Sequence, residues 1–299
     1  MALRNRRQPL PPPDVSVAAL SAEVRVKAVE RKPESTERRE VVAESGVFAV
    51  ICGADAATAN RYDARNDALR SIARRRDLPE GDVAALMEYV AATDCVMRVE
   101  REAALKNDVL NLLRNQKQQP EGLADLLLDM VASGLYAPVI IDYCIQHLGA
   151  MANGVADYAT RARIRETFVA AARNTNEPYA GTALYSLAEL PPKSKDESDE
   201  LCRLTIGLCN ASANPIARIA AIQLAGERGY REALPTLREV LAGGRRDAVL
   251  DMVVVGSIGL LGDASRDVQL LESFRSRGGR RLKTAIDAAV QRIKERGSQ

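Results

Sequence analysis

The residues best suited to chemistry in this chain are few, and His147 is its only histidine. An imidazole can serve as a general base or bind a metal. Cys144 lies three residues earlier, so the two side chains could share one helix face as a pair of soft ligands. Two ligands do not complete a metal site. We therefore expect His147 in a core or boundary position, and we expect neither a metal nor a cofactor.

Two Asn-Asp pairs occupy matching places in the sequence. Asn66-Asp67 and Asn107-Asp108 are separated by 41 residues, each within a similar apolar block. Equivalent polar residues in stacked repeats can form a ladder of side-chain hydrogen bonds, because buried polar groups need partners. We favour this structural role for the four residues. A role in binding a ligand is the alternative.

Arginine is frequent between residues 61 and 76, which could suit a phosphate backbone. At helical spacing these arginines spread around the helix, and Asp63, Asp67 and Asp77 lie between them. A solvated face with local ion pairs is therefore the favoured interpretation. The arginines concerned are Arg61, Arg65, Arg70, Arg74, Arg75 and Arg76.

The elements that position these residues repeat along the chain. Residues 65–72 are RNDALRSI and residues 106–113 are KNDVLNLL, a spacing of 41. Pro-Glu-Gly follows each block, at residues 79–81 and 120–122, and an apolar stretch follows each tripeptide. A helix-sized block, a break and a second helix-sized block in register are typical of a stacked helical repeat.

Proline and glycine divide the chain into short helices. Prolines 79, 120, 178 and 215 lie where helices are expected to begin, and glycines 149, 154, 229 and 262 where they are expected to end. The β-branched run at residues 252–258 is predicted to be a buried helix. The expected helix pairs are 58–76 with 80–92, 97–116 with 120–133, 137–152 with 157–173, 178–190 with 196–210, 214–228 with 230–242 and 246–262 with 265–275, followed by a single helix at 280–296.

One repeat resembles the HEAT family. Residues 216–241 are IARIAAIQLAGERGYREALPTLREVL, with a small pair at Ala220-Ala221, an apolar Leu224, a glycine-bearing turn and a second helix containing ALPTL. The resemblance extends over about residues 58–296 at a spacing of 34 to 41. It implies a right-handed α-solenoid of about six antiparallel helix pairs. HEAT proteins are mostly scaffolds that bind other proteins, so the resemblance carries function only by analogy.

The resemblance also suggests where a partner would bind. In HEAT-like arrays the second helices line the concave side, which would place Glu88 and Asp129 there as an acidic strip for a basic partner. Exposed charge that keeps the surface soluble is the alternative. A competing surface is the basic C-terminal helix, with Arg280, Arg281 and Lys283.

Charge is unevenly distributed although the net charge is only +2. Residues 120–274 carry 14 lysines and arginines against 20 aspartates and glutamates, whereas residues 275–299 carry 8 against 2. Opposite charge in the body and at one end would permit head-to-tail self-association. Solvated helix faces and a basic tail that suits the last helix dipole are the simpler interpretation.

The composition indicates which cellular compartment and which domain organisation to expect. Five cysteines with no metal-ligand spacing indicate buried thiols in a reducing compartment, and no apolar run suits a signal peptide or a membrane span. We expect a cytoplasmic protein, or an exported one if the natural chain carries a leader. The expected parts are a flexible, proline-rich and charged arm (1–45), an N-terminal cap (46–57), HEAT-like repeats (58–279) and a C-terminal capping helix (280–299).

The function expected from the sequence is a non-catalytic protein-binding scaffold. Nucleic-acid binding through basic terminal patches is the alternative. An enzyme is disfavoured: a HEAT-like di-iron enzyme would need several histidines, and a HEAT-like DNA glycosylase relies on tryptophan, which is absent from this chain.

Overall fold

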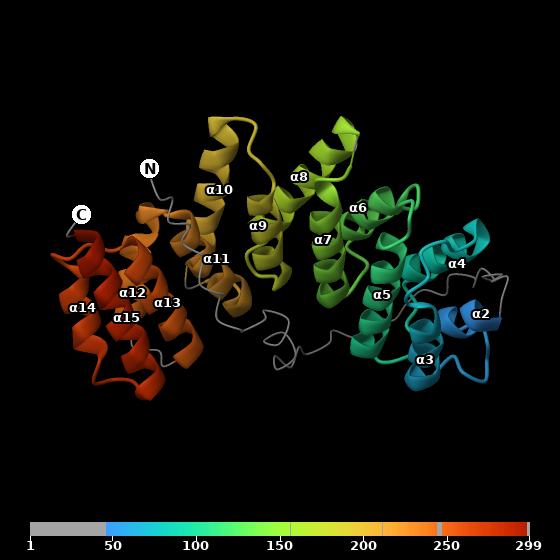
Figure 1. Cartoon of the computed structure of the whole chain (residues 1–299), viewed down its shortest axis with the longest axis horizontal. Helices are drawn as coiled ribbons and strands as arrows, with labels where there is room; N and C mark the ends of the chain where they lie inside the picture. The colour runs from blue at the N-terminus through green and yellow to red at the C-terminus, as the bar shows by residue number, and fades with distance from the viewer. Residues whose placement is uncertain (1–45, 156, 211, 244–246, 298–299) are drawn as a thin grey trace, which may run out of the picture. The chain divides into compact units, whose positions relative to one another are not determined.

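The protein is all-α throughout the residues that the computed structural model describes, which are 46–155, 157–210, 212–243 and 247–297. The predicted N-terminal arm, residues 1–45, lies outside them. No strand occurs in the described ranges (Figure 1). The helices are α2 (Gly46–Cys52), α3 (Tyr62–Ile72), α4 (Glu80–Ala91), α5 (Val99–Arg114), α6 (Leu123–Ser133), α7 (Pro138–Ala152), α8 (Tyr158–Arg173), α9 (Tyr179–Glu189), α10 (Lys195–Leu208), α11 (Pro215–Arg228), the 3₁₀ turn η1 (Arg231–Ala233), α12 (Leu234–Ala242), α13 (Ala248–Leu261), α14 (Asp267–Phe274) and α15 (Arg280–Gly297).

Local chemistry explains most helix boundaries. Pro215 begins α11, where its missing N–H costs nothing, and the Asn214 side chain accepts a hydrogen bond from the Ile216 N–H at 3.0 Å. Gly229 ends the same helix with a left-handed φ of 76°. The β-branched run 252–258 lies within α13, as predicted. None of the described helices combines the length and apolar character needed to cross a bilayer.

The helices pack in an order that repeats along the chain. The odd-numbered helices α3 to α15 form one row, the odd row, in which each helix contacts the next. The even-numbered helices α4 to α14 form the even row, and each packs against the odd-numbered helix that follows it. Leu69 and Leu110, at equivalent positions of the two matching sequence blocks, are both 2% exposed. The apolar faces of successive helices thus merge into one continuous core.

Four successive interfaces of the odd row depend on a glycine. A Cβ placed on each glycine would lie only 2.8 Å from an atom of the next helix in the row, closer than packed carbons approach. The contacts are Gly149 with Ser186, Gly181 with Ala220, Gly226 with Ser257, and Gly259 with Ala289. Small residues on both sides let the backbones come close. Gly149 therefore does not end a helix, as its type had suggested, but lies inside α7.

The glycine contacts draw neighbouring helices of the odd row together. The second helices of the predicted repeats are the even row, and their place on a concave side stays a prediction.

Truncating a core leucine tests the repeat register. Leu110→Ala should lower the free energy of unfolding by about 2–4 kcal/mol, because it leaves a cavity in the interface between neighbouring helices. Leu135→Ala is the control, since Leu135 is 72% exposed and its loss should be nearly neutral. Urea unfolding measures both variants. Equal losses would show that Leu110 does not occupy the core.

Two glycines of α13 test the close approach directly. Gly259→Ala should destabilise the protein by about 1–3 kcal/mol, because the new Cβ would lie 2.8 Å from the Ala289 Cα. Gly256→Ala adds the same methyl group to the same helix where no atom lies within 4 Å. It should be stabilising by up to about 1 kcal/mol through helix propensity. Thermal or urea unfolding that shows the same sign for both variants would contradict the proposed packing.

Candidate functional site

Two buried cations occupy equivalent positions of the repeated sequence block. Arg65 on α3 is 1% exposed and Lys106 on α5 is 2% exposed. The Arg65 Nε donates to the Ile51 carbonyl at the end of α2, at 2.9 Å. The Lys106 ammonium donates to the carbonyls of Val90, at 3.1 Å, and Ala92 at the end of α4. Each cation therefore caps the C-terminus of the preceding helix, where the helix dipole favours positive charge.

An aromatic ring and one carboxylate complete this buried cluster. The Tyr89 hydroxyl donates to Glu102 Oε1 at 2.7 Å, and the Arg65 guanidinium lies 3.4 Å from the same oxygen. Arg65 and Lys106 lie 4.9 and 5.6 Å from the centroid of the Tyr89 ring. Burial lowers the pKa of Lys106. These groups are used in joining α2, α3, α4 and α5, so we interpret the cluster as structural.

Arg65 corrects the interpretation of the arginine-rich segment. The segment was expected to be a solvated face, and its other arginines, residues 61, 70 and 74–76, are exposed. Arg65 is instead enclosed. The usable signal was present in the sequence: arginine and lysine stand at the first position of both repeated blocks, in register with one another.

His147 lies in the core, as expected from the sequence. It is 4% exposed, and Cys144 is fully buried. The His147 Nε2 lies 3.0 Å from the side-chain oxygen of Asn107, one repeat earlier. Burial, and to a lesser degree the cation of Arg114, lowers the pKa of His147 to about 4. The imidazole is therefore neutral near pH 7.

The predicted polar ladder between Asn66 and Asn107 does not form in the described part of the chain. An inter-repeat hydrogen bond instead joins Asn107 to His147. Within the described part of the chain no hydrogen bond joins the side chains of Asn66 and Asn107. Asp67 and Asp108 are exposed. Burial of the carboxyl group raises the pKa of Asp108. The sequence could not show this, because the partner of Asn107 is a histidine outside the two matching blocks.

The predicted partner-binding residues lie on separate surfaces. Glu88 on α4 and Asp129 on α6 are exposed on neighbouring helices of the even row. The Arg163 guanidinium lies 3.9 Å from Asp129 Oδ1 and 2.5 Å from Asp125 Oδ1, which offsets part of the expected acidic strip. The three cations Arg280, Arg281 and Lys283 are exposed at the start of α15.

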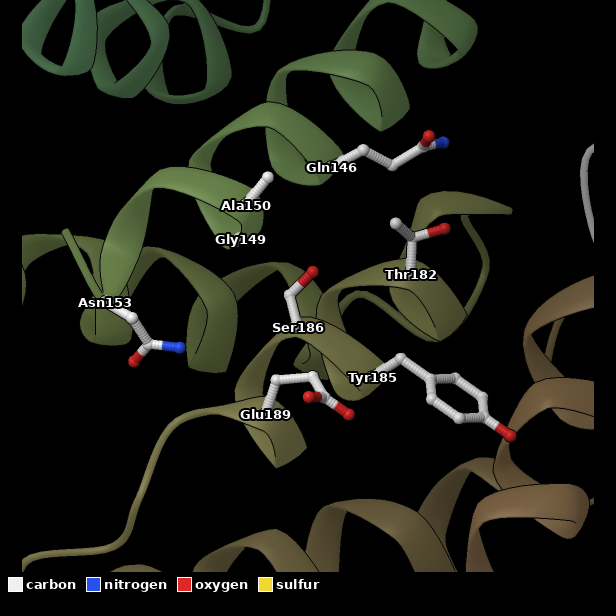
Figure 2. Close-up of a pocket in the computed structure, with 8 residues that line it drawn as sticks. All are labelled: Gln146, Gly149, Ala150, Asn153, Thr182, Tyr185, Ser186 and Glu189. Carbon is white, nitrogen blue, oxygen red and sulfur yellow. The ribbon is translucent and has the colours of Figure 1, made fainter. Parts of the chain in front are cut away.

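A groove that the sequence did not predict lies between α7 and α9 on the odd row. Its volume is about 450 Å³. Figure 2 shows Ser186 pointing toward Gly149 and Ala150. These two small residues leave space on the α7 side of the groove. The groove forms where the glycine contact brings the two helices together. Its lining residues are Gln146, Gly149, Ala150, Asn153, Thr182, Tyr185, Ser186 and Glu189.

One carboxylate, that of Glu189, lines this groove, and two others are hydrogen-bonded to residues that line it. Asp142, one turn before Gln146, accepts a hydrogen bond from the Gln146 amide at 2.8 Å. Burial raises the pKa of Asp142, against the opposing effect of hydrogen bonds from Thr182 and Gln146. Glu189 is exposed at the end of α9. The third carboxylate extends the site onto α11: Glu227 accepts a hydrogen bond from the Tyr185 hydroxyl at 3.4 Å.

Comparisons with known proteins do not identify the site: no family model, no curated protein and no solved structure matches the chain. Within the described ranges, no group of three or more His, Cys, Asp and Glu side chains is arranged to hold a metal ion. All five cysteines are free thiols. The groove and its carboxylates are therefore the arrangement from which function has to be argued.

Acid should remove the contribution of neutral His147 to stability. The folded-state pKa is about 4 and the ordinary value is 6.5, so in this pH window the unfolded chain binds a proton that the folded chain does not. The free energy of unfolding should fall as the pH falls through the window, by about 3 kcal/mol at most from this group. Above pH 6.5 the contribution is fully present.

The variant His147→Gln isolates this effect, because it retains an amide to bond Asn107 but cannot titrate. Urea unfolding of both proteins at about pH 7 and about pH 4.5 gives the difference in free energy of unfolding between them. We expect the unchanged protein to lose more free energy of unfolding than the variant when the pH is lowered. The same difference at both pH values would show that His147 does not titrate abnormally.

Proposed function

We propose that the protein is a non-catalytic scaffold that binds another protein along its odd row. The observation that carries the proposal is the open groove between α7 and α9, which lies on the odd row where Gly149 lets the two helices approach closely. Helical-repeat proteins bind through surfaces spread over several repeats. The HEAT resemblance of residues 216–241 supports the same function by analogy.

Three buried polar groups do not suggest a reaction. Arg65 and Lys106 donate to main-chain carbonyls at helix ends, and His147 is held by Asn107. A catalytic group must reach its substrate, and these side chains are each under 5% exposed. The exposed groove offers amides, hydroxyls and a carboxylate, which are groups that can bind a peptide. We accordingly propose binding rather than catalysis, in a reducing cytoplasm.

A second candidate is an anionic partner such as nucleic acid at the start of α15. Arg280, Arg281 and Lys283 lie near the N-terminal end of that helix, and its first turn contains no acidic residue. Cations at this end oppose the helix dipole, whereas Lys294 and Arg296 in the last turn suit it, as expected. An anion bound there would relieve the repulsion. The acidic body of a second copy could supply that anion in head-to-tail self-association.

The full chain can be used as bait in its native host, and mass spectrometry then identifies the proteins that it captures. Each captured protein is purified, and its direct binding to the chain tests the proposal. We expect that protein to bind directly and Ala150→Tyr to weaken it by about tenfold or more, because the exposed Ala150 lines the groove and a large ring would fill it. Two further sets of substitutions change the other candidate surfaces. They are Glu88→Lys with Asp129→Lys on the even row, and Arg280→Ala with Arg281→Ala and Lys283→Ala on α15.

The three sets of variants separate the candidate surfaces. Loss of binding only in the α15 set would contradict the odd-row proposal and favour an anionic partner. Loss only in the Glu88 and Asp129 set would move the interface to the even row. Failure of every captured protein to bind the purified chain would overturn the scaffold function itself.

A further inference from the structure

We propose that two copies of this chain associate side by side through the exposed face of α13. This inference goes beyond the proposed scaffold function. It also differs from head-to-tail association, which would join the start of α15 to the acidic body of another copy. Its basis is an apolar stripe on α13, a glycine near the centre of that stripe and opposite charges on its two flanks.

The helix α13 is apolar on all sides, although one side faces solvent. Among its 14 residues only Asp251 and Ser257 carry a polar side chain. A helix of this kind is normally covered all round. Three sides of α13 are covered, because it packs against α11, α12 and α15. Four residues at helical spacing form the remaining outward face, which we call the α13 stripe: Val249, Met252, Gly256 and Leu260.

The α13 stripe concentrates exposed apolar surface. Its three large side chains are each more than a third exposed. In the described part of the chain eight large apolar side chains are exposed, and three of the eight belong to the stripe. Ile219 on α11, two turns before the Gly226 that contacts α13, is partly exposed and adds to the same surface. Apolar side chains gathered in this way are typical of a surface that another protein covers.

Packing within one copy does not explain the glycine near the centre of the stripe. A Cβ on Gly256 would meet no atom within 4 Å. A glycine inside a helix destabilises that helix relative to alanine. The four glycines of the odd-row interfaces offset this cost, because each lets a neighbouring helix come close. By the same constraint, Gly256 would let the backbone of a further helix approach the stripe.

The flank of the stripe on α11 is acidic. Glu227 is exposed and accepts a hydrogen bond from Tyr185 of α9, which places its carboxylate on the outer side of the odd row. The neighbouring cation, Arg228, is directed instead to the Ala188 carbonyl at the end of α9. The carboxylate of Glu227 is therefore the charge that this flank presents to a partner.

The flank of the stripe on α15 is basic. Arg292 is exposed, and it follows by three residues the Ala289 that contacts α13, so the two share one side of α15. A surface that is acidic on one flank of an apolar stripe and basic on the other is complementary to a rotated copy of itself. This charge pattern favours a second copy as the occupant.

Charge also selects the direction in which the two copies pack. If the two α13 helices lie parallel, a two-fold axis runs along them and the acidic flank of each copy faces the basic flank of the other. Antiparallel helices would bring like flanks together. Parallel helix dipoles oppose the arrangement only weakly, because their effect is confined to the terminal turns.

The heights of the two charges agree with this arrangement. The close contacts place Gly226 level with Ser257, and Gly259 level with Ala289. Counting along the helices from these contacts puts the charges on residues 227 and 292 about 6 Å apart along the axis. Two long side chains can span that offset and form an ion pair across the interface.

Sedimentation velocity of the full chain over a range of concentrations tests the proposal. We expect a reversible dimer, and we expect Met252→Glu to weaken it by about tenfold or more, because the interface would then bury an unpaired charge. The matched control is Leu135→Glu, the same kind of change at an exposed apolar residue outside the stripe. It should change the dissociation constant by less than about twofold. Circular dichroism confirms that both variants fold.

Gly256→Ala separates association from folding. At a concentration where the protein is monomeric, this variant should melt at a higher temperature than the unchanged chain, as its helix propensity requires. The same methyl group should weaken the dimer by about fivefold or more, because it holds the two α13 helices apart. A dimer that Gly256→Ala leaves unchanged would contradict close packing at the stripe.

A charge swap tests the parallel arrangement. Glu227→Arg and Arg292→Glu should each weaken the dimer by about threefold or more, and their combination in one chain should restore it. A double variant weaker than either single variant would show that the two flanks do not meet, and would overturn the arrangement.

Three other results also decide the matter. A chain that stays monomeric at every concentration overturns the proposal, as does a dimer that Met252→Glu leaves intact. A captured protein that loses binding in Met252→Glu, without self-association of the chain, would show that a different protein covers the stripe. Self-association that Ala150→Tyr does not change, whatever that variant does to a captured protein, supports the dimer independently of the scaffold function.

Discussion

The structure depends on the close approach of the odd-numbered helices at four glycines. Each of Gly149, Gly181, Gly226 and Gly259 faces a small residue on the next helix, at a separation that a methyl group would violate. Such contacts fix both the distance and the rotation between neighbours, because larger side chains would force the helices apart. The position of the even row follows, since each of its helices packs against a member of the odd row. One recurring steric constraint thus sets the arrangement from α7 to α15.

The N-terminal helices are joined by a different interaction. Here Arg65 and Lys106 donate to main-chain carbonyls at the ends of α2 and α4, with Tyr89 and Glu102 between them. Buried charges stabilise a fold only when their hydrogen bonds are satisfied, and removal of one partner is costly. Packing of small residues involves no titratable group, whereas this cluster contains a lysine whose pKa is lowered by burial.

The sequence predicted helices well and contacts poorly. Helix positions depend on local signals such as Pro215 and Gly229, which act over a few residues. Gly149 was misassigned, because a glycine that permits close packing and a glycine that ends a helix look alike in one sequence. Arg65 was misassigned because charge is normally solvated, and only its register with Lys106 signals otherwise. The α7–α9 groove needed the geometry itself, since its walls come from residues about forty positions apart.

The groove and the packing constraint share residues, and this limits how the surface can change. Gly149 and Ser186 form the close contact between α7 and α9, and both line the groove. A larger residue at either position would separate the helices and fill the site together. The carboxylates of Glu189 and Glu227 carry no such constraint, because both are exposed. The depth of the groove is thus tied to the fold, whereas its charge is free to vary.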